Sequence, residues 1–187
     1  MSVAGFVLGL VATVLAVVSI GWQMGTLRLQ RPRPKLTAVI GQVTQAGLVT
    51  NDASSDVRES LADAAEQAED SPLIIGVKVV NAGREPFHVA GWAIRADPDG
   101  TSLVPIEKPI AGADVPHDIP PRGSAVFLTE LQHAHRFADA ASGTEGQSPR
   151  IVLTVSSGAR TYATKPIAPE LISLDQALDQ AAAPPKS

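Results

Sequence analysis

The chain contains no cysteine and only 4% aromatic residues among 187. Without cysteine it can form no disulfide, no thiolate metal site and no cysteine nucleophile. The sequence also lacks a Gly-x-Ser-x-Gly motif, a glycine-rich phosphate loop followed by lysine, and a His-Glu-x-x-His motif. We therefore predict no catalytic residue, no cofactor-binding residue and no metal site, and a protein that is not an enzyme.

Charged side chains are absent from the beginning of the chain. The segment from Val3 to Met24 is apolar throughout and carries no charge. A helix needs ~20 apolar residues to cross a bilayer core. A cleaved signal peptide would instead begin with basic residues and have a shorter apolar core. We therefore predict a transmembrane anchor over residues 1–25 that contacts the lipid bilayer through residues 3–24.

The first charges of the chain are all positive and follow this segment directly. Residues 26–35 form a basic, proline-rich juxtamembrane linker, whose cations are Arg28, Arg31, Arg33 and Lys35. Because Lys and Arg next to a span prefer the cytoplasmic side, we predict a cytoplasmic C-terminal domain. An extracytoplasmic, outward-facing domain is the alternative.

Two pairs of glycines in the anchor are spaced four residues apart: Gly5 with Gly9, and Gly21 with Gly25. Small residues at this spacing allow two helices to approach closely in a membrane. The pairs therefore mark a possible helix–helix packing face and a possible homodimer. The other interpretation is that small residues are simply frequent in transmembrane helices.

The net charge argues against one class of partner. The whole chain carries −4 and residues 1–35 carry +4, so residues 36–187 carry −8. A phosphate backbone or an anionic lipid surface would repel such a domain. We predict no nucleic-acid partner.

Short apolar runs separated by proline and glycine predict a β domain over residues 36–168. Its strands are expected at 36–44, 72–81, 87–95, 101–106, 124–129, 150–156 and 160–165. An acidic helical insertion is expected at 46–70, a loop at 111–123, a helix at 130–141, and an amphipathic helix with a frayed tail at 169–187.

Within this domain, residues 72–81 are nearly all apolar, as in a central strand. We expect them to pair as a hairpin with residues 87–95, which place Trp92 in the core. The absence of strand–helix–strand alternation excludes an α/β fold. The predicted fold is mainly β: an N-terminal transmembrane helix followed by an antiparallel immunoglobulin-like β-sandwich with two or three short helices.

The sequences Ile75-Gly-Val-Lys-Val-Val-Asn-Ala-Gly-Arg-Glu-Pro-Phe-His-Val-Ala-Gly-Trp92 and Ile119-Pro-Pro-Arg-Gly-Ser-Ala-Val-Phe-Leu128 resemble immunoglobulin-like sandwich domains. The resemblance extends over residues 72–165. The layout of the chain is similar to small single-span proteins of unknown function from actinobacteria and their phages. The resemblance implies a fold and no activity.

The histidines offer little for metal binding. His133 and His135 are two residues apart on an expected helix, so they point in different directions. We expect His117 to be solvated in a loop and His88 to face outward from a strand.

Two functions remain open for a cytoplasmic domain, and an outward-facing envelope protein is a third. The preferred one is a membrane-anchored interaction or scaffold protein that presents a strand edge, loops or the Leu171–Leu178 helix to a protein partner at the membrane surface. The alternative is a sensor or carrier that binds a small ligand between residues 111–123 and the sheet.

Overall fold

The protein is described by a computed structural model that covers residues 3–44, 47–53, 72–106, 111–142 and 149–174. These residues form a mainly β structure with antiparallel sheets and three helices. The helices are α1 (Val3–Gln30), α3 (Leu131–Ala141) and α4 (Pro169–Ile172). The strands are β1 (Pro34–Thr44), β2 (Gly47–Asp52), β3 (Leu73–Asn81), β4 (Phe87–Val89), β5 (Gly91–Asp97), β6 (Ser102–Leu103), β7 (His117–Ile119), β8 (Ser124–Glu130), β9 (Arg150–Ser157) and β10 (Arg160–Ala163).

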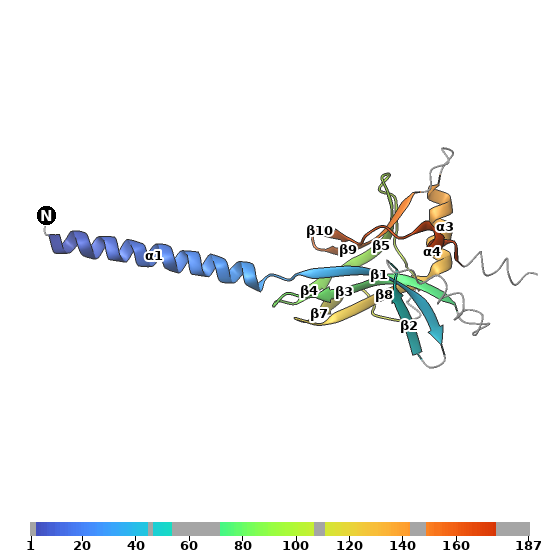
Figure 1. Cartoon of the computed structure of the whole chain (residues 1–187), viewed down its shortest axis with the longest axis horizontal. Coiled ribbons are helices and arrows are strands. Elements are labelled where there is room, and N and C mark those ends of the chain that lie inside the picture. The colour runs from blue at the N-terminus through green and yellow to red at the C-terminus, as the bar shows by residue number, and fades with distance from the viewer. Residues whose placement is uncertain (1–2, 45–46, 54–71, 107–110, 143–148, 175–187) are drawn as a thin grey trace, which may run out of the picture.

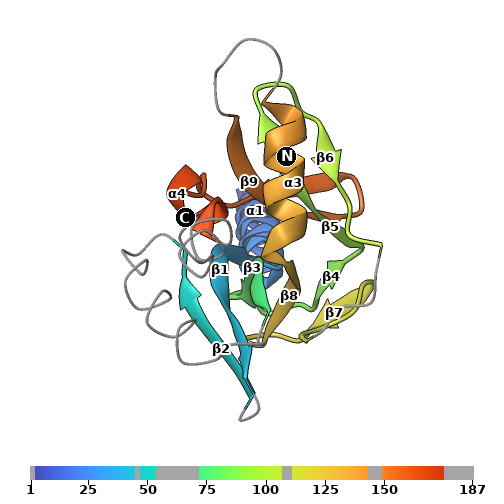
Figure 2. The same cartoon turned by 90° about the vertical axis from the view of Figure 1, so that its right-hand side faces the viewer.

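The strands are arranged in two four-stranded sheets, with the orders β2-β1-β3-β8 and β10-β9-β5-β6, and a small sheet of β4 and β7. Helix α1 projects from one end of the molecule (Figure 1). Helix α3 lies across the opposite end, seen in front of the sheets in Figure 2. One end of the domain is therefore joined to α1, and the other end is covered by α3.

One hydrophobic core is shared by the two large sheets. It contains Ile75 and Val77 from β3, Ile94 from β5 and Leu153 from β9, each with no exposed surface. Trp92 belongs to the same core and is 8% exposed, as the sequence predicts. Side chains alternate along a strand, and on the other face of β3 Ile74 is buried with Val39 and Leu128, whereas Lys78 is exposed.

The strand predicted at 72–81 is confirmed as the central strand β3, since it pairs with β1 on one side and β8 on the other. A Cβ atom at Gly76 would collide with the Phe127 carbonyl oxygen and lie 2.8 Å from the Leu128 side chain. Only glycine allows β3 and β8 to approach so closely. The strand at 124–129, the helix at 130–141 and the final hairpin are confirmed as β8, α3 and β9–β10.

The hairpin predicted between 72–81 and 87–95 is wrong. After β3 the chain crosses to the other side of the core, where β5 pairs with β9 and β6. The short β4 lies between them and pairs with β7. Ala90 interrupts the predicted strand, and its N–H donates to the Ser156 carbonyl (2.9 Å). The apolar pattern is the same for either pairing, because it reports burial and not the partner strand.

Two segments predicted to be irregular or helical contain strands. Residues 47–52, assigned to an acidic helical insertion at 46–70, form β2 and pair in register with β1. Residue 46 and residues 54–70 of that insertion lie outside the described part of the chain. The loop predicted at 111–123 contains β7, and Gly112 forms a bridge to Phe127. The edge strand predicted at 101–106 is confirmed as β6, over two residues only.

The first residues of the C-terminal segment, 169–174, pack into the domain. Leu171, Ile172 and Leu174 are buried in the shared core. Leu171 therefore cannot be offered to a partner, contrary to the preferred hypothesis. Residues 175–187, the rest of the predicted amphipathic helix and tail, lie outside the described residues.

Helix α1 extends over 28 residues, and its side chains are described from Gly9 to Met24. Among the described residues, no helix has the length and apolarity that crossing a membrane requires. The transmembrane assignment of residues 3–24 therefore finds no support there and stays a prediction from the sequence.

The linker predicted at 26–35 is shorter in the structure. Helix α1 continues to Gln30 and β1 begins at Pro34, which leaves three residues between them. These residues pack against the turn after β3: a Cβ atom at Gly83 would lie 2.6 Å from Pro32 Cα. The Arg33 carbonyl also accepts a hydrogen bond from the Ala82 N–H (2.9 Å). The proline-rich junction therefore contacts the domain through its backbone.

Candidate functional site

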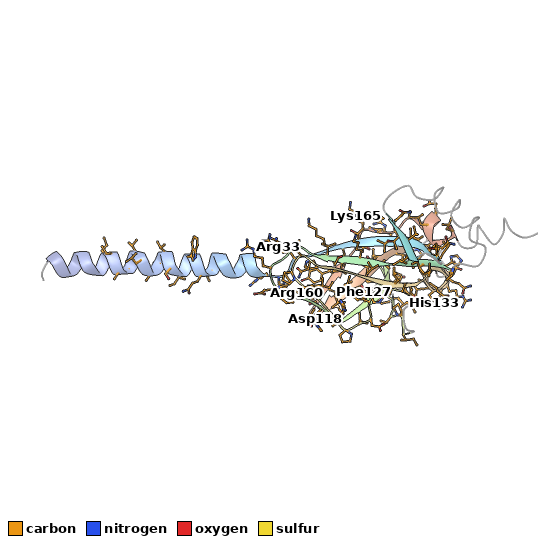
Figure 3. The ribbon with its side chains drawn as sticks, turned by 90° about the horizontal axis from the view of Figure 1, so that it is seen from below. Arg33, Asp118, Phe127, His133, Arg160 and Lys165 are labelled. Atoms are coloured by element: carbon orange, nitrogen blue, oxygen red, sulfur yellow. The ribbon has the colours of Figure 1, made fainter. Side chains whose placement is uncertain are left out.

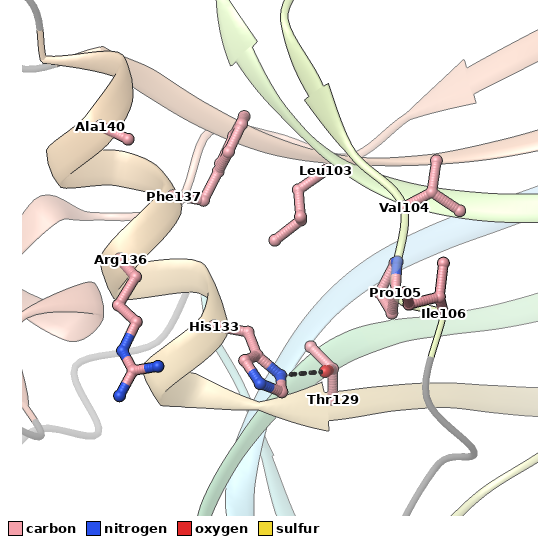
Figure 4. Close-up of a pocket in the computed structure, with 9 residues that line it drawn as sticks. All are labelled: Leu103, Val104, Pro105, Ile106, Thr129, His133, Arg136, Phe137 and Ala140. Atoms are coloured by element: carbon pink, nitrogen blue, oxygen red, sulfur yellow. Dashed lines mark hydrogen bonds between the residues drawn. The ribbon is translucent and has the colours of Figure 1, made fainter.

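A cavity of about 360 Å³ lies at the end of the domain opposite α1, between α3 and the chain that leaves β6 (Figure 4). Most of its lining is apolar. The lining residues are Leu103, Val104, Pro105, Ile106, Thr129, His133, Arg136, Phe137 and Ala140.

The local sequence explains why this cavity forms. Strand β6 ends at Leu103, and Pro105 has no N–H with which to continue sheet pairing. The chain therefore leaves β5 after Leu103, and residues 104–106 line the cavity opposite α3. Val104 is 57% exposed and Ile106 is 94% exposed, so two apolar side chains at the cavity face water. A bound molecule would cover this surface.

Three polar side chains accompany the apolar lining. His133, in the first turn of α3, lies with Nδ1 3.1 Å from the Thr129 hydroxyl at the end of β8. This contact fixes the ring and leaves Nε2 as its second polar atom. Arg136 is exposed at the rim, and its guanidinium extends away from Leu103 and Phe137 (Figure 4). The arrangement suits a small apolar molecule with one polar group near His133.

The cavity is not where the sequence places a ligand. Residues 111–123 pack onto the sheet: the Ala113 N–H donates to the Val126 carbonyl (2.8 Å), and Ile119 is fully buried. The cavity was missed because Leu103 and Phe137 are far apart in the sequence. The one signal in the sequence is an isoleucine, Ile106, in a segment bounded by Pro105 and Pro109.

The histidine predictions have mixed outcomes. His88 is exposed on β4, as predicted, and its Nδ1 lies 2.6 Å from Asp118 Oδ1 on β7. His117 is not a solvated loop residue. It is half-buried in β7 and contacts the Phe127 ring edge-to-face at a centroid distance of 6.1 Å.

His133 and His135 have different surroundings on α3. His133 lines the cavity, whereas His135 Nε2 is buried and lies 3.2 Å from Asp139 Oδ2, outside hydrogen-bonding geometry. The structure therefore does not bring the two rings to one site. Over the described ranges, no group of three or more His, Asp or Glu residues is arranged to hold a metal ion.

The predicted juxtamembrane cations lie where α1 meets the domain. Arg31 and Arg33 belong to the junction and Lys35 to β1, and all three are exposed. Arg28 lies in α1, and its side chain is outside the described residues. Arg33 and Arg160 lie at the same end of the domain, far from His133 (Figure 3).

The four glycines of the possible packing face also lie in α1. An added Cβ atom at Gly9 or Gly21 would meet nothing within 4 Å, and the surroundings of Gly5 and Gly25 are outside the described residues. At 3.6 residues per turn, Gly9 and Gly21 point about 120° apart around the helix. The two pairs therefore do not form one continuous face, and the homodimer stays a prediction.

Comparison of the chain with models of protein families, with curated proteins and with solved structures finds no match.

Proposed function

We propose that this protein is a membrane-anchored, non-enzymatic interaction module, with α1 in a lipid bilayer and the β domain presented at the cytoplasmic surface. The observation that carries the proposal is the exposed apolar surface of α1. Helix α1 projects clear of the domain (Figure 1), and its exposed side chains include Leu10, Leu15 and Val18 at 57–64%. Exposed apolar surface of this kind marks a contact with a membrane or a partner protein, and the proposal assigns it to the membrane.

The arrangement of strands supports an immunoglobulin-like sandwich for the presented domain. In such folds the first, second and fifth strands are neighbours in one sheet, and the third, sixth and seventh are neighbours in the other. Here β1, β3 and β8 are neighbours, as are β5, β9 and β10. Trp92 on β5 occupies the core position that a tryptophan of the third strand occupies in those domains.

A strand edge supports the interaction role. Among the described strands, β2 is at the edge of its sheet and pairs only with β1. Leu48 and Val49 on this strand are 38% and 53% exposed. An exposed, partly apolar edge strand can pair with an extended segment of a partner protein. Cross-linking in membranes, followed by isolation of the chain, would identify that partner.

The two tryptophans of the chain provide a test of the anchor. Trp22 in α1 is 76% exposed, whereas Trp92 is buried in the domain. In vesicles that contain brominated lipids, which quench indoles in the bilayer, we expect the full chain to lose a large part of its fluorescence. The Trp22→Phe variant, which keeps only Trp92, should lose almost none. Equal responses of the two proteins would contradict the anchor.

The cavity favours a second function, the binding of a small apolar ligand. Its volume is within the range of small-molecule sites, about 300–1,000 Å³. A ligand at about 100 times its Kd stabilises a folded protein by about 2.7 kcal/mol. With 2-naphthoic acid as the probe, we expect the melting temperature of the full chain to rise by several degrees. Ala140→Trp, which fills the cavity, should abolish the rise, and Ala140→Ser should keep it. No rise in the unmodified chain would argue against this function.

A further inference from the structure

The end of the domain from which α1 departs carries a concentration of positive charge. Among the residues whose side chains are described, six exposed cations lie there, and we call this surface the basic end: Arg31, Arg33, Lys35, Arg84, Arg122 and Arg160. Two carboxylates accompany them, Glu85 and Asp118, which gives a net charge of +4 with neutral histidines. The Asp118 carboxylate contacts the His88 ring at 2.6 Å. Over the described part of the chain, none of the six cations forms an ion pair.

The fold collects these cations from four separate segments. Pro34 is paired with Asn81, so the junction lies beside the turn that carries Arg84. The Arg122 N–H donates to the Asn81 carbonyl (2.9 Å), which brings the loop before β8 to the same place. Arg160 is at the tip of the β9–β10 hairpin, and it lies at the same end as Arg33 (Figure 3).

The charge is divided along the long axis of the molecule. Toward the opposite end acidic residues outnumber basic ones: Asp97, Asp99, Glu130, Asp139 and Glu170 lie there with Arg95, Arg136 and Arg150. An acidic domain would be expected to avoid anionic lipid if its net charge were evenly spread. In the structure the charge is uneven, because the basic end carries +4. A surface within a Debye length responds to the nearest charges, and that length is about 8 Å at physiological salt.

The length of α1 sets the distance between the basic end and the bilayer. If residues 3–24 occupy the hydrocarbon core, residues 25–30 add six helical residues, or about 9 Å. A headgroup layer is about 5–8 Å thick on each side of the core. The junction is short and packed against Gly83, so the domain has little freedom to move away. The basic end then lies within about one Debye length of the headgroups.

We infer that the basic end docks on anionic lipid headgroups, with Arg84, Arg122 and Arg160 adding to the cations of the junction. This inference rests on the proposed anchor and names the surface that the domain contacts. Docking would fix the orientation of the domain, so that the cavity beside α3 and the acidic residues face away from the membrane.

The absence of cysteine allows the docking to be measured on the full chain. An environment-sensitive nitrobenzoxadiazole label is attached to Ala159→Cys at the hairpin tip, or to Thr101→Cys at the opposite end. In phosphatidylcholine vesicles that contain phosphatidylglycerol, the label at residue 159 should become brighter and shift to the blue. The label at residue 101 should not change. In 1 M salt, where the Debye length is about 3 Å, the response at residue 159 should be lost.

A charge variant separates docking from anchoring. Arg84→Gln, Arg122→Gln and Arg160→Gln together leave the four juxtamembrane cations in place. Each removed cation should lower the ratio of docked to undocked domain about fivefold, and all three about 100-fold. The matched control, Arg95→Gln, Arg150→Gln and Lys165→Gln, removes the same charge elsewhere and should leave the response unchanged.

The outcomes distinguish the inference from the anchor. A label at residue 159 that responds equally with and without phosphatidylglycerol, in a chain that alkaline carbonate does not extract, overturns the docking alone. An equal effect of the two triple variants also overturns it. A chain that carbonate releases from the vesicles overturns the anchor, and the docking inference with it.

Discussion

Asn81→Ala is expected to lower the free energy of unfolding of the domain by about 3–5 kcal/mol, because several buried polar groups lose their partner. The Asn81 side chain is fully buried. Its Nδ2 donates to the carbonyls of Glu85 (2.7 Å) and Ile119 (3.2 Å). Its Oδ1 accepts from the N–H of Gly83 (3.0 Å), with the Arg33 N–H at 3.4 Å. One amide therefore joins the turn after β3, the loop before β8 and the junction to α1.

Urea unfolding in detergent, with the full chain and its Asn81→Ala variant both carrying Trp22→Phe so that the buried Trp92 is the one tryptophan, measures this effect. Asn81→Asp keeps the acceptor but turns a carboxylate oxygen toward two carbonyls, so it should be at least as destabilising as alanine. Ser124→Ala, an exposed polar residue at the same end of the neighbouring strand, should change the stability by less than about 0.5 kcal/mol. A loss below about 1 kcal/mol for Asn81→Ala would show that the network contributes little.

Val11→Arg together with Val14→Arg is expected to release the chain from membranes. Both side chains lie near the middle of residues 3–24, and they are 51% and 55% exposed. An arginine at the centre of a membrane helix costs about 2.5–3.5 kcal/mol on the insertion scale. The pair therefore costs about 5–7 kcal/mol, which is enough to reverse partitioning. The matched control, Val11→Ile with Val14→Ile, should stay in the membrane fraction. If the arginine variant also stays in the membrane fraction, contact of this part of α1 with lipid does not attach the chain to the membrane.

The sequence predicts those elements in which the pattern of apolar residues within the segment shows which face is buried. Strand β3 is predicted because its residues are apolar on both faces, and α3 because Leu131 and Ala134 recur at helical spacing. Strand β2 is missed because Leu48 and Val49 are exposed, so no alternation of apolar and polar residues marks it. Local patterns report burial, and an edge strand with little burial leaves little pattern.

The pairing of strands and the position of the site depend on contacts between distant residues. The same apolar residues in β5 suit a hairpin with β3 or the observed pairing with β9, so the hairpin prediction fails on topology. The cavity needs Leu103 and Phe137 to face each other across two elements. The basic end likewise requires Arg84 and Arg160 to come together, and a net charge summed along the chain cannot show this.

Alkaline carbonate extraction of the unmodified full-length chain from membranes tests the anchor most directly, because it removes proteins held by charge and leaves those held by lipid contact. We expect the chain to remain in the membrane pellet, while the Val11→Arg and Val14→Arg variant is found in the supernatant. Recovery of the unmodified chain in the supernatant would contradict the account.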